Sequence, residues 1–139
     1  VPRLRLGVLA SFDTDLISFL KKDVAIWNIN SFGEFYMQIA GKYKKDYVAA
    51  LKKYRAERNR FISCLKTIHY LRVIPTQANF VMCEVIGKKS KELTEKLLSE
   101  KEIFIKDLTP KINDGKQYIR LAIRNEADND RIIEAFKAF

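Results

Sequence analysis

One long run of helical periodicity limits the folds open to this chain more than any other feature of the sequence. Between about residues 42 and 68, apolar side chains recur at intervals of three and four, the spacing of one face of an α-helix. The positions are Tyr43, Tyr47, Ala50, Leu51, Tyr54, Phe61, Cys64, Leu65 and Ile68. The spacing predicts a long amphipathic helix with its tyrosines in the buried stripe, where they offer no stacking platform for single-stranded nucleic acid.

Short segments with strand patterns lie on both sides of this helix. They combine apolar residues with alternation or with turn signals at their ends. They cover residues 3–11, 71–76, 79–85, 103–108 and 118–124. Strands interleaved with helices predict an α/β fold, specifically an α+β small domain. Its helices, among them a long N-terminal and a C-terminal one, are expected to pack on one face of a small mixed or antiparallel sheet.

Capping residues mark the starts of the shorter helices, because their side-chain oxygens accept hydrogen bonds from free backbone N–H groups. The predicted caps are Ser11 and Asp13 as two candidates for the first helix, Ser31 with Glu34 as a capping box, Ser90, and Asn125 supported by Asp128. These caps also give the paired aspartates of the chain a structural explanation. Beyond these aspartates, no pair of carboxylates for acid–base catalysis, no Ser/His/Asp grouping and no Gly-rich phosphate loop is found in the sequence.

Arginines alternate with apolar residues in the first and the last of the predicted strands. Arg3 and Arg5 share one face of the first strand, and Arg120 and Arg124 share one face of the last. An arginine that loses water on a strand is tolerated only when an anion meets its planar donors. The pattern alone leaves two partners open for Arg5 and Arg120, namely a bound ligand and an internal carboxylate.

The charge of the chain allows a second class of function. The 139 residues carry a net charge of +9, which suits phosphate-bearing partners. Most of the lysines, however, fall on predicted helix exteriors, where a solvated face explains them. With 47% apolar and 12% aromatic residues the chain can build a core, and its length predicts about one domain.

Cysteine usage and hydropathy bear on metal binding and on the compartment in which the protein is found. Cys64, Cys83 and the single His69 lack the spacing of a zinc site or a disulfide framework, so no metal is expected. No apolar run approaches the length of a membrane span, and no leader pattern is present. We therefore expect a soluble, cytoplasmic protein, and the start at Val1 without a methionine indicates a piece of a longer one.

Four segments, in order along the chain, carry a resemblance to a known family. They are "LRLG" (4–7), "WNINSF" (27–32), "PTQANFVMCEV" (75–85) and "YIRLAIRN" (118–125). Together they resemble the C-terminal portion of fold-type I pyridoxal-phosphate enzymes, the class I/II aminotransferases. The likeness is to the branch of histidinol-phosphate aminotransferase and threonine-phosphate decarboxylase.

The resemblance implies roles for three residues. Arg5 would grip the phosphate of pyridoxal 5'-phosphate, Arg120 would clamp the α-carboxylate of the substrate, and Asn30 would contact the substrate. Residues 1–31 would be a remnant of the large cofactor-binding domain, and residues 32–139 the small domain.

The resemblance also implies what the chain lacks. The Schiff-base lysine would lie upstream of Val1, and Lys21 or Lys22 cannot replace it, because the imine forms where the ring pocket holds the cofactor. The chain alone is therefore expected to have no catalytic residue and no activity. Its parent would be a homodimeric aminotransferase, or a decarboxylase of the same branch, acting on an amino acid or an amino-acid phosphate. The alternative is a basic nucleic-acid-binding module or a regulatory interaction module.

Overall fold

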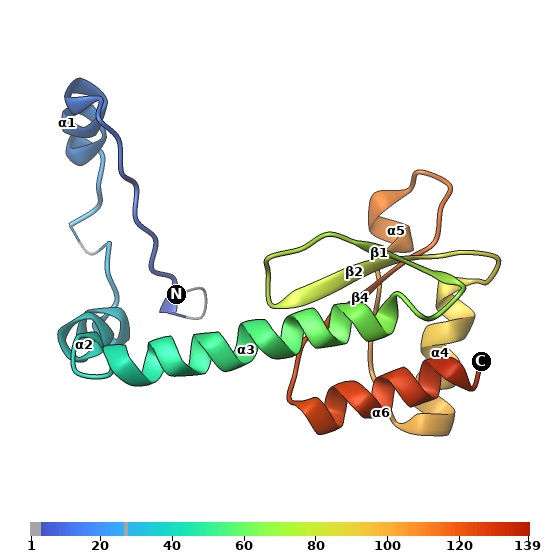
Figure 1. Ribbon diagram of the computed structural model, residues 1–139. Helices are drawn as coiled ribbons and strands as arrows, with labels where there is room; N and C mark the ends of the chain where they lie inside the picture. Colours follow the sequence, from blue (N-terminus) through green and yellow to red (C-terminus); the bar gives the residue numbers. More distant parts are fainter. Residues whose placement is uncertain (1–3, 27) are drawn as a thin grey trace. The chain divides into compact units, whose positions relative to one another are not determined.

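The computed structural model describes residues 4–26 and 28–139 and shows helices together with one four-stranded sheet (Figure 1). In chain order the elements are α1 (Thr14–Lys22), α2 (Ser31–Ala40), α3 (Lys44–Leu65), β1 (Leu71–Ile74), β2 (Phe80–Val85), α4 (Ser90–Lys101), β3 (Lys106–Asp107), α5 (Thr109–Ile112), β4 (Tyr118–Ala122) and α6 (Glu126–Lys137). The chain forms two compact units, which we call unit 1 (Val1–Ala50) and unit 2 (Leu51–Phe139). The predicted division at residues 31 and 32 concerns the domains of a parent enzyme and stays a prediction.

Unit 2 contains the sheet and a hydrophobic core of its own. The strand order is β1-β2-β4-β3, and every neighbouring pair is antiparallel. The second half of α3 lies beside α6 on one face of the sheet (Figure 1). The fully buried side chains of these layers are Phe61, Leu65, Val81, Cys83, Leu97, Ile119, Leu121 and Phe136. The predicted α/β fold with helices on one face of the sheet is therefore confirmed.

The strand predictions differ from the structure in two places. The described part of the first predicted strand forms a turn at Leu4 and Arg5 and then continues without regular structure, and Arg3 lies outside the described residues. A strand needs a hydrogen-bonding neighbour, and the described elements of unit 1 are helices, so apolar alternation was misleading here. In the predicted strand 103–108 only Lys106–Asp107 pairs with β4, and the short helix α5 that follows was not predicted.

Helix caps were predicted correctly at two of the four sites. The side chain of Asp13 accepts from the backbone N of Leu16, and that of Asn125 accepts from Asp128, each at 2.8 Å. Helix α2, however, is capped by Asn30, one residue before the predicted Ser31. Helix α4 has Lys89 at its N-cap position, and Ser90 lies within the first turn.

The cap of α2 gives a direct prediction for two adjacent residues. Asn30 Oδ1 accepts from the backbone N of Gly33 at 2.9 Å, whereas the hydroxyl of Ser31 has no hydrogen bond among the described residues. We expect Asn30→Ala to destabilise α2 by about 1 kcal/mol, the usual cost of a lost cap, and Ser31→Ala to be nearly neutral. Amide hydrogen exchange at Gly33 and Glu34 measures both effects, and equal protection in the two variants would assign the cap wrongly.

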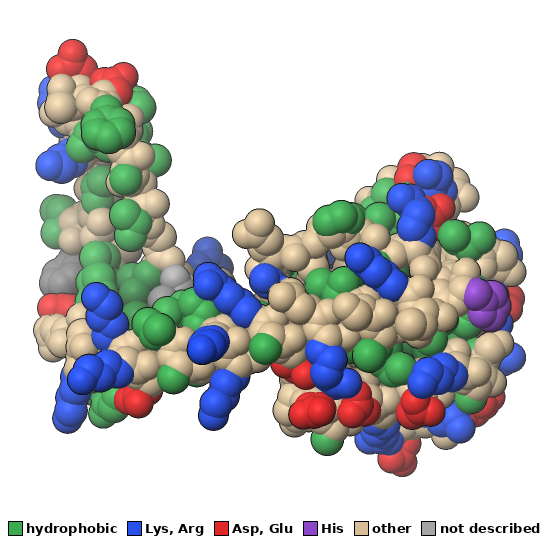
Figure 2. Space-filling view, in the orientation of Figure 1, with side chains coloured by type: hydrophobic (Ala, Val, Ile, Leu, Met, Phe, Trp, Pro, Cys, Tyr) green, Lys and Arg blue, Asp and Glu red, His purple; other side chains and the backbone are tan. Residues whose placement is uncertain are grey.

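Many of the described apolar side chains of unit 1 are exposed. Among its described residues only Gly33 is buried, while Phe12, Phe19, Ile26 and Phe32 are more than half exposed. Figure 2 shows such green side chains over α1 and α2.

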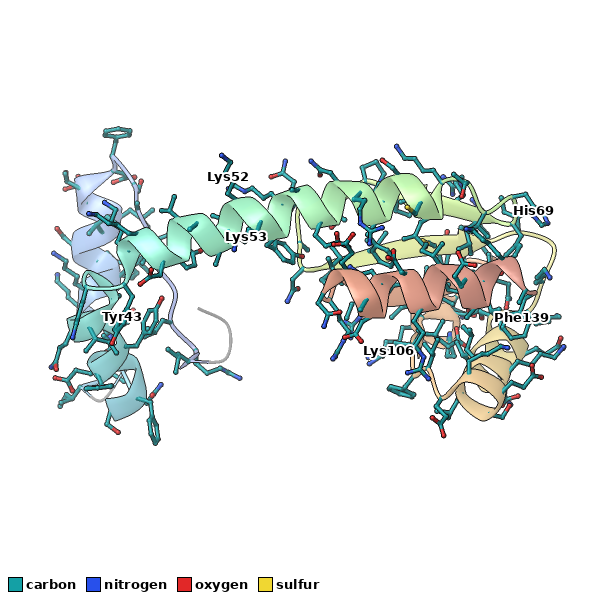
Figure 3. All side chains as sticks on the ribbon, turned by 60° about the horizontal axis from the view of Figure 1, so that its bottom comes forward. Tyr43, Lys52, Lys53, His69, Lys106 and Phe139 are labelled. Carbon is teal, nitrogen blue, oxygen red and sulfur yellow. The ribbon has the colours of Figure 1, made fainter. Side chains whose placement is uncertain are left out.

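The predicted buried tyrosine stripe of α3 is wrong for its first two members. Tyr43, which directly precedes α3 (Figure 3), and Tyr47 are 50% and 63% exposed, although Tyr36 and Ile39 of α2 line the same hollow. Tyr54, farther along the helix, is half-buried against the core of unit 2. No helix in the described part of the chain is both long and apolar enough to cross a membrane.

Candidate active site

The sheet of unit 2 has one face that its helices leave uncovered. The register places Phe80, Met82 and Arg120 on this face, because the neighbouring Val81, Cys83, Ile119 and Leu121 point into the core. We call the surface formed by Ile74, Phe80, Met82, Lys106 and Arg120 the open face.

One end of this side of the sheet is covered. Tyr118 belongs to the same side by register, yet it is buried, and its hydroxyl donates to Asp114 Oδ2 at 2.9 Å. That hydrogen bond to a carboxylate raises the pKa of Tyr118. The segment between β3 and β4 therefore occupies the Tyr118 end, and the open face is accessible around Arg120.

Arg120 is exposed on the open face and has no acidic partner among the described residues. Its guanidinium carbon lies 5.4 Å from the centre of the Phe80 ring. The same side of the sheet offers a contrast, because Arg72 pairs with Glu84 on the neighbouring strand. Of these two arginines, Arg120 is the one whose donors remain available for an anion from outside the described chain.

Lys106 lies directly across from Arg120 in the register of β3 and β4. It is half-buried, is labelled in Figure 3, and forms no ion pair with a described carboxylate. Like charges directly opposite one another on a sheet destabilise it. An anion bound between these two cations would remove that cost, so the pair forms a candidate site for a ligand with more than one negative charge.

The position of Lys106 is fixed by the residue that follows it. Asp107 points to the other face, where its Oδ1 accepts from Ser90 Oγ and from the backbone N of Thr109, both at 2.9 Å. Ser90 is 1% exposed and also contacts the side chains of Thr109 and Gln117. These hydrogen bonds use the hydroxyl of Ser90, which explains why Ser90 does not cap α4.

The sequence analysis did not single out Lys106 as a site residue. Its run, "IFIKDL", was assigned to a strand, but nothing local indicates which residue of which strand it faces. Lys106 could have been found only by aligning the charged residues of two neighbouring strands. That alignment needs the strand register, which the sequence alone does not supply.

In unit 1 a hydrogen bond joins the two segments that carry the predicted site residues Arg5 and Asn30. Asn30 Nδ2 donates to the backbone O of Leu4 at 2.9 Å, while its Oδ1 caps α2. Leu6 lies against Gly33, where an added Cβ would be 2.9 Å from Leu6 Cδ2. The turn that carries Arg5 is thereby fastened to the start of α2.

Arg5 itself is exposed, has a φ of 59°, and forms no ion pair with a described residue. Its guanidinium therefore fits a role in binding an external phosphate, which it can meet through two parallel hydrogen bonds. Arg5 belongs to unit 1 and Arg120 to unit 2, so the structure describes each within its own surroundings.

Other candidate chemistry is limited within residues 4–26 and 28–139. No group of three or more His, Cys, Asp or Glu side chains there is arranged to hold a metal ion. Cys64 and Cys83 are free thiols, and burial raises the pKa of Cys83 to about 12, so it is a poor nucleophile. His69 is exposed and packs edge-on against Tyr70 (Figure 3).

Comparison with a family model decides the relationship. The model for "Aminotransferase class I and II" matches residues 1–136. The chain belongs to the aminotransferase class I and II family. This confirms the family that the four sequence segments resemble, and members of the family depend on pyridoxal 5'-phosphate.

Individual relatives of this aminotransferase-family chain agree with the assignment. The chain is 33% identical over 138 residues to an L-serine phosphate decarboxylase of Sulfurospirillum multivorans, covering 97% of this chain and 35% of the relative. It superposes on a decarboxylase structure from that organism with a TM-score of 0.77, 32% identity and coverages of 91% and 36%. For a histidinol-phosphate aminotransferase of Clostridium acetobutylicum the values are 0.74, 29%, 89% and 37%. The chain thus spans about a third of the length of these proteins.

Proposed function

We propose that this chain is the substrate-binding part of a pyridoxal-phosphate enzyme that acts on an amino-acid phosphate. The observation that carries the proposal is the pair of Arg120 and Lys106, two cations directly opposite one another without a described acidic partner. An amino-acid phosphate carries a carboxylate and a phosphate, so it presents one anion to each. The name of one relative, an L-serine phosphate decarboxylase, supports this substrate class.

The two cations are suited to different ends of such a substrate. The planar guanidinium of Arg120 matches a carboxylate through two parallel hydrogen bonds, which fixes orientation as well as position. The ammonium of Lys106 acts as a point charge on a flexible stem and binds a phosphate without demanding one geometry. Two fixed anions orient the bonds of the substrate's α-carbon between them.

Arg5 and Asn30 are proposed to serve the cofactor and the substrate. When bound, pyridoxal phosphate supplies an electron sink for the electrons released when a bond to the α-carbon breaks. Arg5 would hold its phosphate, and the turn fastened by Asn30 would hold Arg5. Each end of the Asn30 amide has one bond to the protein, which leaves one hydrogen and one lone pair for the substrate.

The remaining properties of the parent are also proposals. We propose that it is a cytoplasmic homodimer that transfers amino groups, with decarboxylation as the second candidate because one relative at 33% identity is a decarboxylase. The imine-forming lysine would belong to the part of the parent outside this chain, which spans only about a third of its relatives. The chain alone would then be inactive.

A comparison of substrates tests the proposal on the full-length enzyme with cofactor bound. O-phospho-L-serine and L-serine are supplied with and without 2-oxoglutarate, and both carbon dioxide and keto-acid formation are followed. We expect the phosphorylated substrate to react with a kcat/KM at least about 100-fold higher, because its phosphate gains a charged contact. Equal values for the two substrates would overturn the proposal, and the product identifies the reaction.

Replacement of Lys106 separates the two ends of the substrate. We expect Lys106→Gln to lower kcat/KM for O-phospho-L-serine by about 10- to 100-fold, the worth of a hydrogen bond to a charged group. The value for L-serine should change less than about twofold, because L-serine has no phosphate to lose. The matched control is Lys111→Gln, an exposed lysine on α5 that should leave both values unchanged. Equal losses for both substrates would contradict a phosphate contact.

A further inference from the structure

The aromatic ring beneath Arg120 suggests a second residue in substrate binding. Phe80 begins β2 and pairs with Ala122, so it lies diagonal to Arg120 on the open face. Its ring centre is 5.4 Å from the guanidinium carbon, within the range of a cation–π contact. Met82 occupies the position directly across from Arg120, and the small Ala122 leaves the approach to the ring free.

This contact constrains Arg120 without using its hydrogen-bond donors. An aromatic face attracts the flat side of a guanidinium, while the N–H groups lie in the guanidinium plane and stay available. Among the described residues the ring is the one side-chain partner recorded for Arg120. A long side chain held in this way loses less rotational freedom when a carboxylate binds.

Phe80 is in turn held by the loop before it. The backbone O of Asn79 accepts from Ile123 at 3.1 Å, which closes the end of the β2–β4 ladder. The hydroxyl of Tyr54 donates to the O of Ala78 at 3.2 Å, and Arg58 Nη1 donates to the O of Gln77 at 2.6 Å. Helix α3 therefore holds Gln77 and Ala78, and Ile123 holds Asn79, directly before Phe80.

We propose that Phe80 is a positioning residue that holds the guanidinium of Arg120 in place for the substrate carboxylate. The inference rests on the proposed function, because it takes Arg120 as the carboxylate-binding group. Phe80 itself would not touch the reacting atoms. Its loss would therefore weaken binding of the carboxylate in the ground state and the transition state alike, raising KM more than it changes kcat.

Two unreactive ligands that differ by one carboxylate test this on the full-length enzyme with cofactor bound. 4-Phosphonobutyrate has a carboxylate and a phosphonate but no amine, and propylphosphonate lacks the carboxylate. We expect Phe80→Leu and Phe80→Met to raise the inhibition constant of 4-phosphonobutyrate by about two- to tenfold, the cost of ordering one long side chain. That of propylphosphonate should stay within about twofold, and Phe80→Tyr, which keeps the ring, should match the wild type for both ligands.

Each other result counts against the inference. An unchanged constant for 4-phosphonobutyrate in both the Leu and the Met variant overturns it, as do equal losses for the two ligands, which indicate a structural role. Arg120→Leu is measured in parallel. If that variant binds both ligands like the wild type, the proposed function fails. If Arg120→Leu raises the inhibition constant of 4-phosphonobutyrate but not that of propylphosphonate, and the Phe80 variants change neither, the positioning role alone fails.

Discussion

Replacing Arg120 by leucine in the full-length enzyme is expected to lower kcat/KM for its amino-acid substrate by about 100-fold or more. Under the proposed function, the variant loses two charge-assisted hydrogen bonds to the substrate carboxylate, which leaves that charge unpaired in the site. Arg120→Lys should fall between the leucine variant and the wild type, since it keeps the charge but loses the planar fork. Absorbance of the bound cofactor should not change in either variant, because cofactor retention is assigned to Arg5.

The same strand pattern supplies the control for this experiment. By alternation, Arg124 was expected on the same face as Arg120. Both are exposed, but Arg124 pairs with Asp128 at 2.7 Å. Arg124→Leu should leave kcat/KM within about threefold, because an exposed ion pair contributes little. Steady-state kinetics of the three variants would contradict the assignment if Arg120→Leu behaved like Arg124→Leu.

Replacing Asn129 is expected to have the largest effect on folding. Asn129 is 1% exposed, and its Oδ1 accepts from the backbone N of Arg124 at 3.0 Å. Its Nδ2 donates to the backbone O of Arg124 at 3.1 Å and to Glu57 Oε1 at 2.7 Å. Asn129→Leu leaves the backbone N and O of Arg124 without these partners and removes one of the hydrogen bonds to Glu57, which keeps those from Arg60. We expect the free energy of unfolding to fall by about 2 to 4 kcal/mol.

The midpoint of urea unfolding of the 139-residue chain measures this loss, and amide exchange in β4 identifies the part that unfolds. Asn79→Ala is the control, because Asn79 is exposed and its side chain has no hydrogen bond among the described residues. A loss for Asn129→Leu no larger than that of Asn79→Ala would show that the three hydrogen bonds do not stabilise the fold.

The pH dependence of the free energy of unfolding tests the carboxylate that Asn129 contacts, Glu57. Hydrogen bonds from Arg60, and after them from Asn129, hold the pKa of Glu57 below its usual value. A carboxyl whose pKa is lower in the folded state contributes stability above its unfolded pKa and loses that contribution as the pH falls. In the wild type, this contribution should therefore decline only below about pH 4.5.

Asn129→Asp should reverse the sign. It places a second carboxylate against Glu57, and two adjacent carboxylates raise the pKa of one of them. We expect the variant to be less stable than the wild type at pH 7, and the difference to shrink as the pair takes up a proton toward pH 5. A difference that stays constant across this range would mean that the two carboxylates do not interact.

Local signals in the sequence were sufficient where a residue acts on its own neighbours. Asp13 and Asn125 were assigned as caps because a cap bonds to an amide three residues away. The same reasoning failed by one position at Asn30 and Ser31, two adjacent residues that can both cap a helix. At Ser90 it failed because the hydroxyl is used by Asp107, which lies 17 residues farther along the chain.

Long-range pairing marks the limit of what the sequence predicts here. The strand predicted over 118–124 is present as Tyr118–Ala122, because alternation separates its two faces. Arg120 was singled out from Arg124 on the same face by the family resemblance. Lys106 and Phe80 were not recognised, since their importance comes from the strand order and register that place them beside Arg120. The predicted burial of Tyr43 and Tyr47 failed for a related reason, because periodicity gives the apolar face of a helix but not what covers it.

The two residues of β3 divide two tasks between adjacent positions. Asp107 binds the strand to the buried hydroxyl of Ser90 and to the backbone N of Thr109, whereas Lys106 is not part of the hydrophobic core. A substitution at position 106 should therefore leave folding nearly unchanged, while under the proposed function it would alter which anion is bound.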